Sequence, residues 1–195
     1  MITSFTTPYT CAAASLTGHA SNVTGAAWTI TTAACPDGLA HKVTVRNDAA
    51  VDHSGKTITL VGLGANGEVV TEVLTAPNVS ATVTSAKFYR HLTSITPSAT
   101  IGADTMDIGW TAAAMTPWVA ILKIPATVAV YITGTINYDI QHSHADNALD
   151  ANLYPFTSDS GKTANFEHAY TAPVKCARVL VNSHTSGTLA VSTLF

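Results

Sequence analysis

The residues of this sequence that could do chemistry gather at 142–146, where it reads HSHAD. Histidines two positions apart on a strand point to the same side, and zinc accepts imidazole and carboxylate ligands. His142, His144 and Asp146 could therefore share a metal ion, with His168 and His184 available in principle. The segment lies, however, where a predicted strand ends and a polar loop begins, and no second ligand cluster accompanies it. We favour exposed loop histidines or contacts to another subunit, and predict no bound metal or cofactor.

A second segment, residues 62–67, reads GLGANG and matches the GxGxxG of dinucleotide-binding proteins. That fingerprint needs its glycines between a strand and a helix N-terminus, with an acidic residue about 20 positions later. Here the glycines lead into EVVTEV, a β-branched run that is poor for a helix. Asn66 and Gly67 explain the segment as the central pair of a type I′ hairpin turn, in which both residues have positive φ. We predict a hairpin turn at Asn66 and Gly67 and no nucleotide site.

No set of residues identifies an enzyme. The sequence has no GxSxG, and none of Cys11, Cys35 and Cys176 has a recognisable histidine partner. The odd number of cysteines and the lack of CxxC indicate reduced thiols in or near the core. A loose acidic loop at 146–152 lacks the spacing and the glycine of an EF-hand. We therefore predict no catalytic residues.

The composition favours sheet and limits the partners. Only 11% of the 195 residues are charged, against about 25% in typical domains. About one residue in six is threonine, which is β-branched and suits a pleated surface. The net charge is -3 and the nine Lys and Arg are scattered singly, so we expect no nucleic-acid binding. No apolar run approaches the roughly 18–20 residues that span a bilayer, and the N-terminus lacks the charged region of a signal peptide.

Short strand-like runs separated by turn residues predict an all-β, antiparallel β-sandwich or jelly-roll-like fold. The clearest run is 129–142, whose strict alternation of apolar and polar residues excludes a helix. Residues 183–187 are interpreted as a short hairpin loop, and at most one short helix is expected, near 145–153. The other predicted strands are 39–47, 56–63, 68–75, 79–84, 86–96, 105–110, 174–182 and 188–194.

The chain is expected to comprise an extended N-terminal arm and two packed β modules, or one continuous sandwich. The arm covers 1–25, the first module 26–110 and the second 111–195. A change of composition at 111–117 marks the expected join. The loosely patterned arm could order on a neighbouring subunit.

The stretch from Leu60 to Trp110 resembles a group of virion structural proteins of tailed bacteriophages. It carries G-x-x-A-N-G-E-x-x-T-E-x-L-T-A-P-N (62–78, with Gly64 as a further glycine), V-T-S-A-K-F-Y (83–89), L-T-S-I-T (92–96) and I-G-W (108–110). In the C-terminal part, G-T-I-N-Y-D-I-Q-H (134–142) and Y-T-A-P-V (170–174) followed by A-R (177–178) add to the similarity. The sequence departs from the pattern at Ala65, where an Asp is common, and at Ala76, where a Gly is common.

The resemblance implies a structural role in a virion, favouring a capsid decoration or cement protein on the outside of the head. The implied partners are the major capsid protein and copies of the chain itself, as a homotrimer, with the chain made in the host bacterial cytoplasm. A tail, collar or neck component is the first alternative. The second is a carbohydrate-binding module for host glycans, which would require Trp110, Trp118 and Tyr131 to face solvent together.

Overall fold

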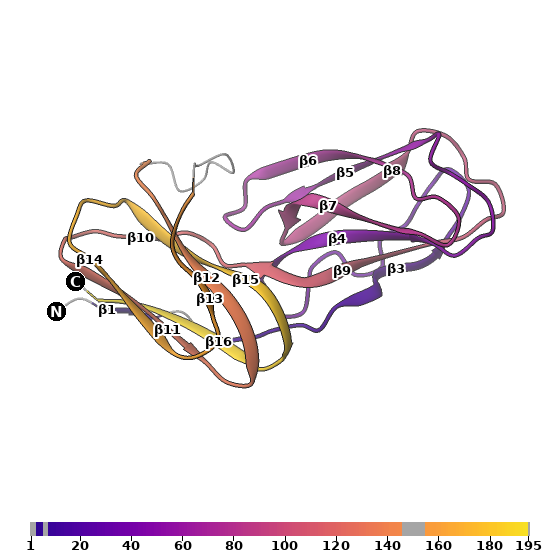
Figure 1. Cartoon of the computed structure of the whole chain (residues 1–195). Coiled ribbons are helices and arrows are strands. Elements are labelled where there is room, and N and C mark those ends of the chain that lie inside the picture. Colours follow the sequence, from indigo (N-terminus) through magenta and orange to yellow (C-terminus); the bar gives the residue numbers. More distant parts are fainter. Residues whose placement is uncertain (1–2, 6–7, 146–154, 195) are drawn as a thin grey trace. The chain divides into compact units, whose positions relative to one another are not determined.

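The computed structural model describes residues 3–5, 8–145 and 155–194, and every helix or strand found in them is a β-strand (Figure 1). The predicted all-β, antiparallel fold is confirmed. The described residues include no helix that could cross a membrane. The chain divides into two units, which we call the central unit (Ala14–Thr111) and the terminal unit (Met1–Ala13 with Ala112–Phe195). The short helix expected near 145–153 falls, except for its first residue, outside the described residues.

The central unit holds two groups of paired strands around one apolar core. A three-stranded antiparallel sheet has the order β6-β5-β8, and in the second group β3 pairs with β9 and β4 pairs with β7. Its core includes Val43, Val45, Leu60 and Met106, all fully buried. The strands are β3 (Ser15–Val23), β4 (Ala40–Asn47), β5 (Thr57–Leu63), β6 (Val69–Thr75), β7 (Thr82–Tyr89), β8 (His91–Pro97) and β9 (Met106–Met115).

The hairpin between β5 and β6 differs from the predicted turn type. Gly67 has a φ of 86°, but Asn66 is not among the residues with positive φ, so the type I′ prediction is wrong. The Gly67 N–H instead donates to Gly64 O at 3.2 Å, and the Gly64 N–H donates to Glu68 O at 2.8 Å. Ala65 and Asn66 are therefore the centre of the turn, and Gly67 takes the left-handed position that follows it. This is the three-residue loop form, in which only the glycine needs positive φ.

One predicted boundary between strands moves. The runs 79–84 and 86–96 are separated at residue 90, between β7 and β8, rather than at residue 85. The composition change at 111–117 lies where the chain passes from one unit to the other, between Thr111 and Ala112, although β9 itself continues to Met115. Small residues at 112–114 are compatible with a strand, so alanines alone did not mark a loop.

The terminal unit is built from two antiparallel sheets. One has the order β1-β16-β11-β14 with β2 paired to β16, and the other places β12 between β13 and β15 with β10 on β15. Each sheet contributes buried side chains, among them Val128 and Leu189 from the first and Ile140 and Val181 from the second. The strands are β1 (Thr3–Phe5), β2 (Tyr9–Thr10), β10 (Val119–Ala120), β11 (Ala126–Ile132), β12 (Thr135–Ser143), β13 (Phe156–Lys162), β14 (Phe166–Tyr170), β15 (Cys176–Ser186) and β16 (Thr188–Leu194).

The predicted single strand at 129–142 is two strands that lie in different sheets. β11 and β12 are separated at Thr133 and Gly134, and their partners β16 and β15 are separated opposite them at Gly187. The predicted hairpin loop at 183–187 is therefore also wrong, since only Gly187 lies between β15 and β16. The Thr133 N–H donates to Thr188 O at 3.0 Å, which keeps the two segments of the chain paired through the bend. Strands that pass together from one sheet to the other in this way form the corner of a sandwich.

The described part of the N-terminal segment is extended and pairs with strands of its own chain. Thr3–Phe5 and Tyr9–Thr10 pair with β16, and Ser15–Val23 pairs with β9 through an irregular register. The described residues of the expected arm thus order on their own chain. The pairing with both β16 and β9 accounts for the loose alternation that made this segment look like an arm.

Candidate functional site

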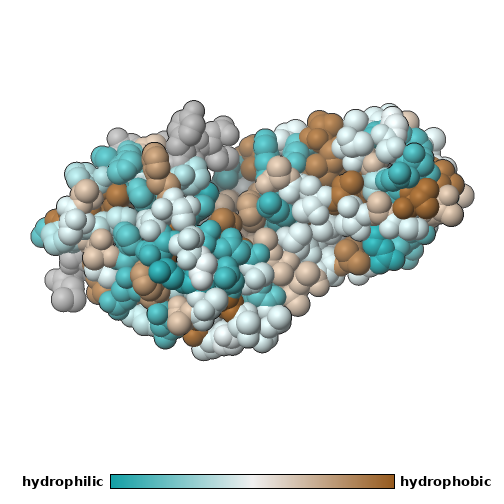
Figure 2. Space-filling model, viewed as in Figure 1, coloured by the Kyte–Doolittle hydropathy of each residue, from teal (hydrophilic) through white to brown (hydrophobic). Residues whose placement is uncertain are grey.

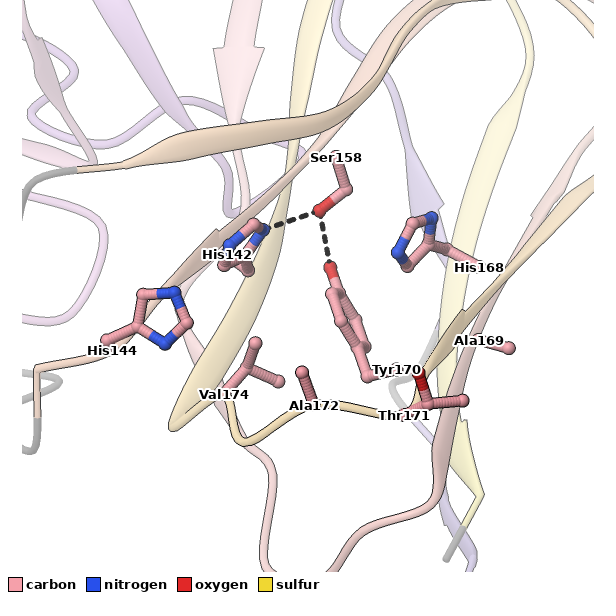
Figure 3. A pocket seen from close by; sticks show the side chains of 9 residues that line it. All are labelled: His142, His144, Ser158, His168, Ala169, Tyr170, Thr171, Ala172 and Val174. Atoms are coloured by element: carbon pink, nitrogen blue, oxygen red, sulfur yellow. Dashed lines mark hydrogen bonds between the residues drawn. The ribbon is translucent and has the colours of Figure 1, made fainter.

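A pocket with a volume of about 330 Å³ lies in the terminal unit (Figure 3). Three short stretches line it: the end of β12, the middle of β13, and the run from β14 to β15. Its polar side chains come from all three stretches, and its floor is apolar. The lining residues are His142, His144, Ser158, His168, Ala169, Tyr170, Thr171, Ala172 and Val174.

Strand pairing explains why these residues meet. β12 pairs with β13 so that His142 lies opposite Phe156, and two irregularities in the register shift the rest of β13 along β12. On β14, His168 and Tyr170 are two positions apart and so lie on the same side. The edge strands β13 and β14 therefore bring Ser158, His168 and Tyr170 towards the end of β12.

A chain of hydrogen bonds crosses the pocket. His142 Nδ1 lies 2.6 Å from Ser158 Oγ, which lies 2.8 Å from the Tyr170 hydroxyl (Figure 3). Burial lowers the pKa of His142, and the neighbouring His144 and His168 lower it further. Burial also raises the pKa of Tyr170, against a smaller opposite effect of Ser158. His142 is thus held neutral and Tyr170 protonated near neutral pH.

On the other side of Tyr170, His168 is joined to an acidic residue. His168 Nδ1 lies 2.5 Å from Asp159 Oδ2, and Lys162 Nζ lies 3.1 Å from the other oxygen of the same carboxylate. The His168 ring also packs against the Tyr170 ring, with 4.4 Å between their centroids. Asp159 therefore has two partners and orients His168 rather than facing the pocket as an unpaired charge.

The two histidines singled out in the sequence lie next to each other. The ring centroids of His142 and His144 are 5.2 Å apart, and Phe156 stacks on His142 at 5.5 Å. His144 Nδ1 is 2.9 Å from Pro173 O. The third candidate ligand, Asp146, lies outside the described residues, as does the whole acidic loop at 146–152. Within the described residues, no three His, Cys, Asp or Glu side chains are grouped closely enough to share a metal ion.

The described residues of the pocket show only part of the arrangement that activates a nucleophilic serine. Ser158 has a base within reach in His142 Nδ1, but in the described part of the chain no carboxylate is hydrogen-bonded to that imidazole. A nucleophilic serine relies on a base that is itself oriented by a third group. In the second histidine–carboxylate pair, Asp159 orients His168, whereas the hydrogen-bond partners of Ser158 are His142 and Tyr170. The arrangement fits ligand binding through imidazole nitrogens better than acyl transfer.

Two buried histidines of the central unit serve the fold. His41 Nδ1 lies 2.8 Å from Thr111 O and its Nε2 lies 2.9 Å from Asp37 Oδ2. His53 lies between Asp104 at 3.0 Å and the Lys56 ammonium at 2.9 Å. With both ring nitrogens bound, neither histidine has a nitrogen left for a ligand.

The aromatic residues proposed for a sugar-binding face do not share a surface. Trp110 is 7% exposed and packs beside His19, and Trp118 is 8% exposed with the Arg178 guanidinium 4.3 Å from its ring. Only Tyr131, at 45%, faces solvent. The requirement stated for carbohydrate binding is therefore not met. The three cysteines are buried and none of them is in a disulfide, as the sequence predicted.

The sequence pointed to His142 and His144, with His168 as a further available ligand, but gave no sign of Ser158, Asp159 and Tyr170. The two-residue spacing of His168 and Tyr170 indicates side chains on the same side of a strand. The sequence did not show which strand pairs with it. The comparisons with known proteins add no further candidates: no family model matches the chain, and no curated protein or solved structure matches it at a significant level.

Proposed function

We propose that this protein is a structural component of a tailed-bacteriophage virion, and specifically a decoration or cement protein that binds the outside of the head. The observation that carries the proposal is the position of the residues that resemble such proteins. The segments 62–78 and 92–96 belong to β5, β6 and β8 and so build the three-stranded sheet of the central unit. They form a surface rather than a catalytic centre.

The outer face of this sheet is suited to repeated protein contacts. Side chains on this face are Thr, Val, Leu and Ser, with His91 at one end, and none is an acid, a lysine or an arginine. Val69 is 74% and Val73 is 60% exposed, and apolar residues gather over β5 and β6 in Figure 2. Exposed apolar surface of this kind marks interaction sites more often than chance.

The residues shared with the phage pattern hold this sheet in place. Asn66, which the pattern shares, donates its N–H to the Glu68 carboxylate at 2.9 Å inside the β5–β6 turn. Glu72 accepts the N–H groups of Ala86 and Lys87 at 2.7 and 3.0 Å, and so ties β6 to β7. These residues serve a turn and a contact between strands, which is the role expected of such residues in a structural protein, and this supports the proposal.

The test is binding to phage heads from which accessory proteins have been removed. A decoration protein binds in large and fixed numbers over the whole shell, counted by mass measurement of the loaded particle. Binding of a few copies at one vertex would instead indicate a neck or collar protein. Failure of the protein to bind either phage heads or phage tails would refute the virion assignment.

Two variants test the surface. Val73→Lys places a charge on the outer face of the three-stranded sheet, and we expect it to weaken shell binding while the protein stays folded. Val79→Lys is the matched control, because Val79 is also an exposed valine (46%) but lies between β6 and β7. Equal losses for the two variants would show that this face is not the contact surface.

A further inference from the structure

The pair of histidines at the end of β12 has the geometry of a metal-binding pair. We propose that His142 and His144 bind one divalent transition-metal ion through their Nε2 atoms, with water completing the coordination. Imidazole suits zinc, copper and nickel, and zinc is the reference ion here. The site does not depend on the proposed virion role.

The separation of the rings is the first support. When two imidazoles bind one tetrahedral ion, with Zn–N distances of about 2.0–2.1 Å, their ring centroids lie about 5 Å apart. The centroids of His142 and His144 are 5.2 Å apart and their planes are inclined by 80°. In Figure 3 the two rings lie side by side, each with a ring nitrogen turned toward the other. Little movement is therefore needed to admit an ion.

The proton on His144 is placed as a metal ligand requires. Its Nδ1 faces the Pro173 carbonyl oxygen at 2.9 Å, and a carbonyl oxygen can only accept a hydrogen bond. Nδ1 therefore carries the proton, and in the neutral ring Nε2 keeps its lone pair. Histidine ligands of metals almost always donate their other N–H to a carbonyl or carboxylate in this way.

His142 can reach the same state without moving any heavy atom. Its Nδ1 is held by Ser158 Oγ at 2.6 Å, and Ser158 is held by the Tyr170 hydroxyl at 2.8 Å. If Nδ1 donates to Ser158 and Ser158 donates to Tyr170, then His142 Nε2 has its lone pair free for a metal. Both hydroxyls can turn to give this direction.

The surroundings leave room for the ion and its water. The pocket of about 330 Å³ opens beside both rings. Asp159, the acid on β13 nearest to these histidines, is already bound to His168 and Lys162. The pair thus offers two nitrogen ligands and open positions, which is a partial site rather than a closed structural one.

The experiment is a calorimetric titration of the full chain with zinc chloride and, separately, nickel chloride. We expect saturable binding of one ion per chain and a rise in the melting temperature with either metal. His144→Gln should lower the affinity at least tenfold, and because His144 is exposed it should not change the melting temperature of the metal-free protein. Ser158→Ala should lower the affinity by roughly tenfold, since partners of metal-ligating histidines contribute about 10–100-fold.

The matched control is His91→Gln, because His91 is an exposed histidine of the central unit, remote in sequence from the pocket. This variant should bind zinc as the unaltered chain does. Unchanged affinity in His144→Gln, an equal loss in His91→Gln, or no saturable binding at all would overturn the proposal. Loss in His168→Gln without loss in His144→Gln would also overturn it, because the ligands would then be a different set.

Discussion

The glycine between β15 and β16 offers the sharpest test of the bend that shapes the terminal unit. Gly187 has a φ of +131°, and a Cβ added there would lie 1.8 Å from Thr133 O on the paired strand. Gly187→Ala therefore meets two separate costs. A sparsely populated backbone conformation costs about 1–3 kcal/mol, and forcing an extra carbon into a filled space costs about 1–3 kcal/mol more.

A second glycine of the same unit separates the two costs. Gly161 on β13 has a φ of +64°, but a Cβ there would meet no atom within 4 Å. Gly161→Ala should then lower the free energy of unfolding only by the cost of the left-handed conformation, about 1–2 kcal/mol. We expect Gly187→Ala to lower the free energy of unfolding by about 4 kcal/mol, which leaves this variant roughly 2–3 kcal/mol less stable than Gly161→Ala.

The assay is unfolding in urea and by heat for both variants and the unaltered chain. In a unit of about 100 residues, 1 kcal/mol corresponds to about 4–8 °C, so the two variants should differ in midpoint by roughly 10–20 °C. If Gly187→Ala does not fold, Gly134→Ala supplies a milder change at the same bend, since its Cβ would lie 2.5 Å from Ser186 O. Equal losses for Gly187→Ala and Gly161→Ala would refute the close strand contact at the corner.

Three further predictions concern other parts of the chain. Glu72→Gln should lower the free energy of unfolding by about 1–2 kcal/mol in urea denaturation, because it weakens charge-assisted bonds to two N–H groups, and the exposed Glu167→Gln should change it little. His19 is 1% exposed and burial lowers its pKa below 6.5, so its neutral ring stabilises the fold above pH 6.5. As the pH falls below 6.5, the unfolded chain takes up a proton that the folded chain does not, so the free energy of unfolding should fall by up to about 1.4 kcal/mol per pH unit. The fall should be smaller in His19→Gln. An equal dependence on pH in the variant and the unaltered chain, measured by urea denaturation, would contradict this. Burial raises the pKa of Cys35 to about 12, so a thiol reagent such as DTNB should label it only on unfolding, and rapid labelling of the native chain would contradict its burial.

The alternation of side chains predicted most of the strands but could not predict the corner. From 129 to 142 apolar and polar residues alternate without a break, and Ile132 and Ile136 remain in phase across the bend because Thr133 and Gly134 add two residues. A two-residue interruption preserves a two-residue period, so the pattern carries no trace of it. The available signal was Gly134 inside a strand, since glycine there often marks a bend.

The candidate site was predictable only where it depends on neighbours in sequence. His142 and His144 were found because their spacing fixes their direction on one strand. Ser158 reaches them through the pairing of β13 with β12, whose register shifts twice between Tyr138 and Gln141, and Tyr170 comes from β14, which pairs with β11 in the other sheet. Each shift changes which residues lie opposite one another, and no local pattern encodes that change.

The edges of the central unit bear on how such a protein could assemble. Unpaired strand edges invite open-ended addition of further strands, whereas a particle with fixed copy numbers needs contacts that stop. Where β6 and β7 lie together, the Glu72 carboxylate takes up the Ala86 and Lys87 N–H groups, and the Lys87 ammonium donates to Thr71 O at 2.8 Å. These side chains occupy the backbone groups that another strand would need. Under the proposed virion role, partners would contact the uncharged outer face rather than this edge, and a charge at Val73 should then weaken shell binding more than a charge at Val79.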